Sequence, residues 1–286
     1  MAIKADLHNH LQTSNDFTRV DFNRVVNVAS ARLGEGGILG VTNFVTDDSL
    51  DNRYETLSTK PGYDRDNKGR ALYVPEKKLW IVKSQEVPTL VNGHEVHLLV
   101  IGLPEHKHLK PGRPLEDAMK EGRDLGGKLV FDHPGYTHGI LPHLNLDLSS
   151  RVMPQIDGWE VFNSSAALNF GNLSIVSRAF PPKANERAQN YYAEVIAPSY
   201  PHVKPLCSSD GHSLAEIGRA FTTVYHILNG ETDSTRLIDE IFEGIPTTGY
   251  KDTGLKGSPV RSAMHAAAVI KENGLFNTLG RFVKKE

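Results

Sequence analysis

The sequence predicts an α/β protein in which a parallel sheet is covered by helices. Short apolar, β-branched runs alternate with longer segments whose apolar residues recur at helical spacing, which is typical of strands connected by helices. With 286 residues, the chain is long enough to bury a large core. Histidine and acidic residues repeatedly follow the strand-like runs. Because active sites in such folds lie beyond the carboxyl ends of the strands, we expect the site at that rim.

The chain opens with a strand and an amphipathic helix. Residues 3–7 are expected to form the first strand, and residues 38–42 the second. Between them, segment 21–33 carries its apolar residues on one helical face. Gly34 follows that segment directly, so the helix is expected to end there.

A long polar segment follows the second strand. From Val45 to Lys78 the chain is rich in Asp, Arg and Lys and shows no sustained periodicity. Connections of this length in compact domains are usually lids, binding loops or mobile insertions. We therefore expect a polar insertion at about 45–78, beside the rim, that selects the substrate.

The remaining pattern continues the alternation of strands and helices to the end of the chain. Asn92-Gly93 predicts a tight hairpin between two of the strands. The remaining strands are expected at 79–82, 95–102, 128–131, 157–162, 203–207 and 221–227, and the remaining helices at 115–125, 184–196, 234–242 and 262–273. No repeat or linker divides the chain, so we expect one domain over 1–286 with a helical C-terminal segment at about 258–286.

Composition restricts the classes of function. The net charge of −2 and 23% charged residues give no basic excess of the kind that binds long nucleic acids. One cysteine, Cys207, excludes an internal disulfide, and the start of the chain lacks a signal-peptide core. Apolar runs such as 98–103 are too short to span a bilayer. These features predict a soluble cytoplasmic protein without a membrane partner.

Thirteen histidines beside one cysteine favour catalytic metal chemistry, because imidazole and carboxylate ligands suit Zn, Mn or Fe with open coordination positions. His8 and His10 are two residues apart at the end of a strand and therefore share one face. Further acidic and histidine residues lie at or just past the carboxyl ends of other strands. They are Glu86, His133, Asp210 and His212, with His97 brought close by the hairpin.

Four motifs together resemble one known family. They are Asp6-Leu7-His8-Asn9-His10, Glu86 with Glu95-Val96-His97, Asp132-His133-Pro134, and Ser209-Asp210-Gly211-His212. In order and separation they resemble the PHP (polymerase and histidinol phosphatase) superfamily, from about residue 3 to about residue 226, and look closest to its stand-alone phosphoesterase-like branch. The resemblance implies a distorted (β/α)7 barrel, up to three metal ions at its carboxyl rim, and hydrolysis of phosphate esters.

The resemblance also implies a ligand set. His8, His10, Glu86 and Asp210 would hold one metal ion. Glu86 would bridge to a second ion, which the two remaining histidines, His97 and His133, would complete. The implied cofactors are two or three divalent ions of Zn, Mn or Fe.

A third metal ion would be held by Asp16 and His212, but its middle ligand is missing. Where the family has Thr-Asp-His, this chain has Thr42-Asn43-Phe44, and a phenyl ring cannot bind a metal ion. Asp47, Asp48 or His138 could replace the ligand, although each alone reads more simply as a solvated loop residue.

Other polar residues could assist catalysis. His138 follows His133 by five residues and is the candidate acid for the leaving group, and Arg219 is a candidate for binding phosphate oxygens. For Arg53, Arg65 and Lys83, ion pairs or solvated positions are the simpler interpretation. Glu160 is expected to support a metal ligand and not to bind metal itself.

The first hypothesis is therefore a metal-dependent hydrolase of a phosphate ester, either a small phosphorylated metabolite or a nucleotide. Short nucleic acids remain candidates that the charge balance does not favour. One alternative is a hydrolase with the same metal chemistry that acts on a non-phosphate bond, as amidohydrolases do. The other is a metal-binding module whose catalysis is impaired by Asn43-Phe44.

Overall fold

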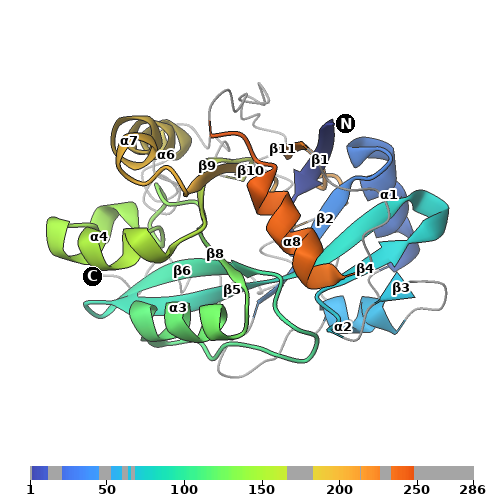
Figure 1. The fold of residues 1–286 in the computed structure, drawn as a ribbon, viewed down its shortest axis with the longest axis horizontal. Helices are drawn as coiled ribbons and strands as arrows, with labels where there is room; N and C mark the ends of the chain where they lie inside the picture. The colour runs from blue at the N-terminus through green and yellow to red at the C-terminus, as the bar shows by residue number, and fades with distance from the viewer. Residues whose placement is uncertain are drawn as a thin grey trace, which may run out of the picture.

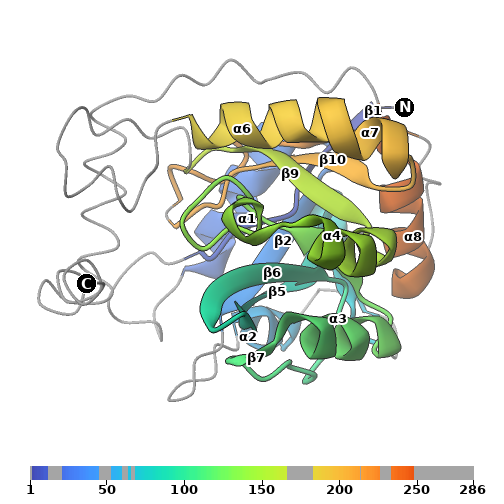
Figure 2. The same ribbon diagram turned by 90° about the vertical axis from the view of Figure 1, so that its left-hand side faces the viewer.

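The computed structural model shows an α/β fold (Figures 1 and 2). It describes residues 2–11, 21–44, 53–59, 64–65, 68–165, 183–212, 214–225 and 233–247. Several predictions lie outside these residues: those for Asp16, Asp47, Asp48 and the helical segment at about 258–286.

Every strand and helix predicted within the described residues is present. The strands are β1 (Ala2–Asp6), β2 (Ile38–Phe44), β3 (Asp64–Arg65), β4 (Ala71–Val74), β5 (Leu79–Val91), β6 (His94–Ile101), β7 (Arg113–Pro114), β8 (Lys128–Phe131), β9 (Gly158–Asn163), β10 (Lys204–Ser208) and β11 (Thr222–Tyr225). The helices are α1 (Phe22–Leu33), α2 (Arg53–Ser58), α3 (Leu115–Asp124), α4 (Leu146–Val152), α6 (Ala184–Tyr191), α7 (Ala197–Ser199) and α8 (Ser234–Glu243). Single helical turns lie at η2 (Pro75–Lys77), η3 (Leu141–His143), η4 (Met153–Gln155) and η5 (Tyr192–Ile196).

The main sheet curls into a nearly closed barrel. Its strand order is β10-β9-β8-β6-β5-β2-β1-β11. The two edges meet through Thr222 of β11, whose hydroxyl accepts from the Cys207 amide at 2.9 Å and donates to the Cys207 carbonyl at 3.0 Å. Seven strands from β10 to β1 thus surround one interior, which confirms the distorted (β/α)7 barrel.

The strand directions correct the prediction of a parallel sheet. The pairs β1·β2, β2·β5, β8·β9 and β9·β10 are parallel, but β5·β6, β6·β8 and β1·β11 are antiparallel. The reason is the turn at Asn92-Gly93, where φ values of 52° and 80° let the chain reverse at once. A two-residue turn can only join antiparallel strands. The turn sets His97 opposite Pro88, two residues from Glu86, so both functional side chains share the barrel interior.

The prediction of an irregular polar insertion at about 45–78 is wrong for its described parts. Tyr54 and Leu57 of α2 are fully buried, and β4 pairs antiparallel with β5. These side chains pack with Leu72 and with the apolar face of α1. The i, i+3 spacing in α2 provides one apolar face, so this stretch contributes to the core instead of forming a free lid.

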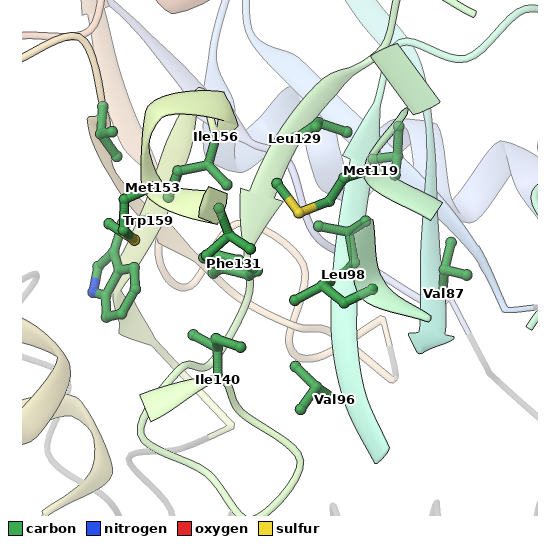
Figure 3. Close-up of a cluster of buried hydrophobic side chains, with 14 of the residues drawn as sticks. Val87, Val96, Leu98, Met119, Leu129, Phe131, Ile140, Met153, Ile156 and Trp159 are labelled. Atoms are coloured by element: carbon green, nitrogen blue, oxygen red, sulfur yellow. The ribbon is translucent and has the colours of Figure 1, made fainter. Parts of the chain in front are cut away.

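Apolar side chains fill both faces of the barrel wall. Outward-facing residues of β5, β6, β8 and β9 pack against α3 and the turns near Met153 (Figure 3). Burying each such side chain contributes about 1.5–3 kcal/mol. Inward-facing residues pack against the apolar face of α8. Among the described residues, no helix has the length and apolar character that crossing a bilayer requires.

Candidate metal centre

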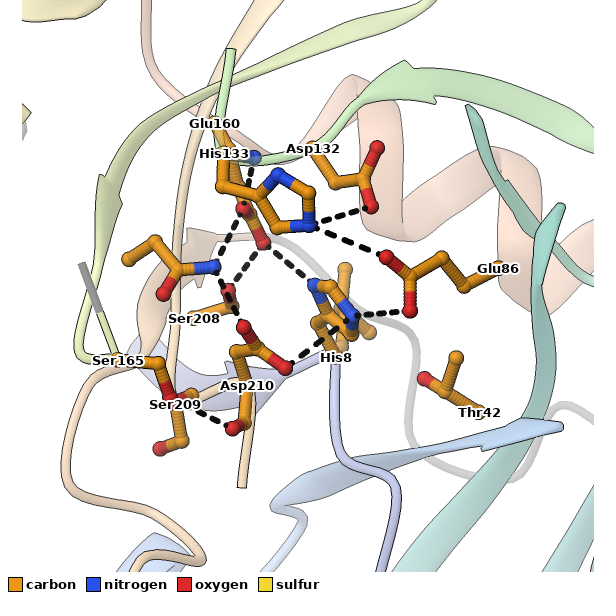
Figure 4. Close-up of polar contacts among 12 residues, drawn as sticks. His8, Thr42, Glu86, Asp132, His133, Glu160, Ser165, Ser208, Ser209 and Asp210 are labelled. Atoms are coloured by element: carbon orange, nitrogen blue, oxygen red, sulfur yellow. Dashed lines mark hydrogen bonds and ion pairs between the residues drawn. The ribbon is translucent and has the colours of Figure 1, made fainter. Parts of the chain in front are cut away.

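Six of the predicted ligands converge at the carboxyl rim of the barrel: His8, His10, Glu86, His97, His133 and Asp210. Figure 4 labels His8, Glu86, His133 and Asp210 among them. The end of β1 is joined to the loop after β10, because the His10 amide donates to the Gly211 carbonyl at 2.8 Å. Asp6 fastens the same loop: its carboxylate accepts from the amides of Ser209 at 2.9 Å and Gly218 at 2.7 Å. These contacts hold the ligand Asp210 beside the two histidines of the first motif.

His8, His10 and Asp210 form the first ligand group. The Nε2 atoms of the two histidines lie 3.2 Å apart, and Asp210 Oδ1 lies 3.6 Å from His8 Nε2 and 3.4 Å from His10 Nε2. Glu86 Oε2 approaches His10 Nε2 at 2.9 Å. All four side chains are buried, so nitrogen and oxygen ligand atoms surround one small volume.

Glu86, His97, Asp132 and His133 form the second ligand group. Glu86 Oε1 contacts His97 Nδ1 and lies 3.1 Å from His133 Nε2. Asp132 Oδ2 lies 3.3 Å from the same His133 nitrogen. Glu86 thus faces one group with each oxygen, as the bridging role that the resemblance implies would require.

Opposite charges dominate the electrostatics of the rim. Burial on its own would lower the pKa of His8, but Asp210 and Glu160 raise that pKa well above its usual range. Burial likewise opposes the charged form of His97, yet Glu86 raises the His97 pKa to about 10. The pKa of Glu86 is held well below its usual range, because the neighbouring histidines outweigh its burial.

The side chains fit divalent metal ions. Asp210 Oδ1, both oxygens of Asp132 and His133 Nδ1 are buried without a hydrogen-bond partner among the described residues. Buried polar atoms in native proteins are nearly always partnered, and a bound cation would partner the carboxylate oxygens that the described residues leave without a hydrogen bond. Imidazole nitrogens and carboxylate oxygens are the ligands that divalent Zn, Mn and Fe accept.

The third metal site remains a prediction. His212 Nδ1 donates to the Asp210 carbonyl at 2.9 Å, and its ring centre lies 4.7 Å from that of His10. The backbone of Phe44 pairs with that of Glu86 where β2 and β5 lie side by side. Asp16 lies outside the described residues.

Asn43, which stands where the resemblance implies an aspartate, has partners that an amide satisfies. Its Nδ2 donates to Glu55 Oε2 at 2.8 Å, and its Oδ1 accepts from the Tyr54 amide at 3.3 Å. Glu55 is itself paired with the fully buried Lys83. An amide satisfies both neighbours, whereas an aspartate would set two carboxylates against each other. Lys83 is thereby committed to this ion pair and not to a phosphate.

Asn43→Asp is therefore expected to destabilise the fold by about 1–3 kcal/mol, since the Glu55 oxygen loses its donor and gains a like charge. Urea unfolding at pH 7 measures the change. Glu55→Gln provides the matched control, because Gln can donate to the new aspartate. In the double variant, Asn43→Asp should cost clearly less than in the wild-type background; equal costs would contradict this account.

His138 lies at the edge of the second ligand group. Its ring stacks on His97, with centres 5.2 Å apart, and its Nδ1 lies 3.3 Å from Glu95 Oε1. The same Glu95 oxygen lies 3.2 Å from His97 Nε2. The Arg219 side chain donates from Nε to the Ala215 carbonyl. The catalytic roles of His138 and Arg219 stay predictions.

Glu160 supports two ligands at once. Its Oε1 accepts from His8 Nδ1 at 3.0 Å, and its Oε2 accepts from the His133 amide at 2.6 Å. Sequence reasoning expected this kind of support, but it assigned no role to Asp132 or Glu95, although both lie within the quoted motifs. For Asp132, the signal was its spacing of two residues from the inward-facing Val130.

No family model matches the chain, and neither does any curated protein. Among solved structures, the chain is similar to PsfC from Pseudomonas syringae PB-5123, with a TM-score of 0.54, 19% identity, and coverage of 96% of this chain and 99% of that one. It is also similar to the lesion-specific endonuclease PfuEndoQ from Pyrococcus furiosus, with a TM-score of 0.53, 14% identity, and coverage of 87% and 57%. A two-domain Bacteroides vulgatus protein containing a predicted PHP-like metal-dependent phosphoesterase has a TM-score of 0.48 at 16% identity, covering 85% and 70%.

At identities of 19% and 14%, the similarity to the first two structures establishes the fold alone. The TM-score of 0.48 for the third structure is too low to support an argument. Fold and ligand geometry together define an α/β barrel protein with a candidate two-metal centre at its carboxyl rim. The barrel is the fold that the resemblance to the PHP superfamily implies, and residues from its four motifs meet at that rim.

Proposed function

We propose that this chain belongs to the PHP superfamily and hydrolyses a phosphate ester with two divalent metal ions. The observation that carries the proposal is the position of Glu86. One of its oxygens lies 2.9 Å from His10 Nε2, and the other lies 3.1 Å from His133 Nε2. A carboxylate shared by two buried imidazole groups is a typical bridge in two-metal hydrolases.

Each ligand group would hold one ion. His8, His10 and Asp210 bind the first, His97 and His133 bind the second, and Glu86 spans both. When bound, two such ions neutralise the phosphate, acidify a water molecule and stabilise the leaving oxygen. Asp210 and Glu86 are almost fully buried, so packing keeps their ligand atoms in place.

His138 is the proposed proton donor to the leaving oxygen. It is 39% exposed and stacks on His97, so it lies at the mouth of the centre within reach of a substrate. Arg219 is retained as a proposed phosphate-binding residue, because the loop that carries it is fastened to Ser209, next to Asp210.

The proposed substrate is a small phosphorylated molecule or nucleotide. The net charge of −2 disfavours long nucleic acids. PfuEndoQ is described as a lesion-specific endonuclease, but this chain matches 57% of that protein. Short oligonucleotides therefore belong in the test as a competing class.

The test combines metal analysis with a substrate screen. Protein purified without chelator is expected to contain close to two ions of Mn, Fe or Zn per chain by plasma mass spectrometry. Metal-loaded protein should hydrolyse p-nitrophenyl phosphate or a nucleotide faster than bis(p-nitrophenyl) phosphate, oligonucleotides, esters and amides, and EDTA should abolish this activity. Absence of bound metal after Mn or Zn addition, or activity on non-phosphate substrates alone, would refute the proposal.

Metal binding is expected to release protons at neutral pH. In the metal-free protein, the raised pKa values of His8 and His97 keep both imidazoles protonated at pH 7. A metal ion requires the unprotonated nitrogen, so the apparent affinity should rise with pH. Calorimetric titration in two buffers of different ionisation enthalpy measures the release. A binding enthalpy that is independent of the buffer would contradict this expectation.

A further inference from the structure

Asp132 is a buried carboxylate that the ligand set implied by the resemblance does not use. Its side chain has no exposed surface, and neither oxygen has a hydrogen-bond partner among the described residues. An unpaired carboxylate in such a place is costly, so buried carboxylates are normally paired or bound to metal ions. The nearest basic group among the described residues is His133, whose Nε2 lies 3.3 Å from Asp132 Oδ2.

The backbone directs both Asp132 and His133 toward the centre. Val130 packs in the barrel interior and Phe131 packs outside it, so Asp132 continues the inward-facing alternation. His133 would then point outward, but its φ of 26° breaks the alternation. Glu160 holds this turn by accepting from the His133 amide at 2.6 Å.

Three ligand atoms consequently meet at one place. His133 Nε2 faces Glu86 Oε1 at 3.1 Å and Asp132 Oδ2 at 3.3 Å, and Figure 4 shows both contacts leaving the same nitrogen. One N–H cannot satisfy two carboxylates with good geometry. A cation between the three atoms would satisfy all of them.

We propose that Asp132 is a direct ligand of the second metal ion, in addition to Glu86, His97 and His133. This inference rests on the proposed function and refines it. Two carboxylates and two imidazoles form a harder, more negative ligand set than one carboxylate with two imidazoles. Asp132 therefore shifts the relative affinity of the second site toward Mn²⁺, compared with a site that lacks this carboxylate.

The test is Asp132→Asn, with Asp157→Asn as the matched control. Asp157 directly precedes β9 and accepts from the Leu129 amide of β8 at 2.9 Å, so the control changes a carboxylate that contacts β8 away from the rim. Metal-free protein is titrated with Mn²⁺, and free Mn²⁺ is measured by its electron paramagnetic resonance signal. Asp132→Asn is expected to bind one ion as wild type does and the second roughly 10–100-fold more weakly. Asp157→Asn should bind both ions unchanged.

Thermal unfolding separates a ligand from a structural carboxylate. In EDTA, Asp132→Asn should melt at the wild-type temperature or above it, because a buried charge is removed. With Mn²⁺ its increase in melting temperature should be smaller than that of wild type. A lower melting temperature in EDTA, or two wild-type Mn²⁺ affinities, would overturn the role of Asp132. If the wild-type protein binds fewer than two ions, the proposed two-metal centre is refuted. If it binds two ions and Asp132→Asn binds both equally well, only the role of Asp132 is refuted.

Discussion

Glu86→Ala is expected to abolish hydrolysis and to weaken both metal sites at once. Each of its oxygens faces one ligand group, so among the described residues of the two groups Glu86 is the one whose substitution removes a ligand atom from both. Metal ions stabilise the charge of such transition states by several kcal/mol. A loss of about 4 kcal/mol corresponds to a rate at least ~10³-fold lower. Turnover of p-nitrophenyl phosphate and metal content per chain measure the two effects.

Three further variants test whether Glu86 is the bridge. His10→Ala should weaken only the first Mn²⁺ ion, and His97→Ala only the second. Glu35→Ala removes an exposed carboxylate that pairs with Lys78 and should leave both sites unchanged. If Glu86→Ala weakened one site and spared the other, the bridging arrangement would be refuted.

The convergence of the ligands could be predicted because it follows from where strands end. His8, His10, His133 and Asp210 lie beyond carboxyl strand ends, and those ends share one rim whatever the separation in sequence. Glu86 lies within β5, opposite Phe44 at the end of β2, which places it at the level of the same rim. On two strands, an apolar residue inside the barrel is followed by an acidic residue at the rim. Val82 and Val130 lie in the apolar layer, while Glu86 and Asp132 lie above them at the rim.

The features that could not be predicted depend on contacts between distant segments. Asn43 looked like a lost metal-site residue, but its partner Glu55 lies in a helix that the polar composition concealed. Asp132 faces inward by the alternation from Val130, but His133 reaches the site beside it only because of one φ angle, at His133 itself. The residue types alone indicate neither that Glu55 is the partner of Asn43 nor that His133 has a positive φ.

The Glu160 carboxylate is held in place by four hydrogen bonds. Four donors converge on its carboxylate: His8 Nδ1, Ser208 Oγ, the His133 amide and Asn163 Nδ2. Burial alone would raise the pKa of Glu160, but His8 and the other donors lower it, so the group is ionised. When a metal ion is bound, donation from His8 Nδ1 to Glu160 would leave Nε2 without a proton and facing the metal site.

Glu160→Ala is expected to lower the stability of the fold by about 3–5 kcal/mol, because it leaves buried donors and His8 without their counter-charge. Binding of the first metal ion should weaken roughly 10–100-fold. Urea unfolding in EDTA and Mn²⁺ titration measure the two effects. Glu116→Ala, which removes an exposed carboxylate paired with Arg151, is the matched control and should change neither.

Glu160→Gln separates the charge and acceptor pattern of this side chain from its size. If the Gln amide nitrogen faces His8, then His8 must accept at Nδ1 and carry its proton on Nε2, which blocks the metal. If the amide nitrogen faces the other way, it meets the donors of His133 and Asn163. Either orientation loses metal affinity, so Gln should not rescue the first site. Wild-type Mn²⁺ affinity in Glu160→Gln would show that Glu160 fills space and does not set the tautomer of His8.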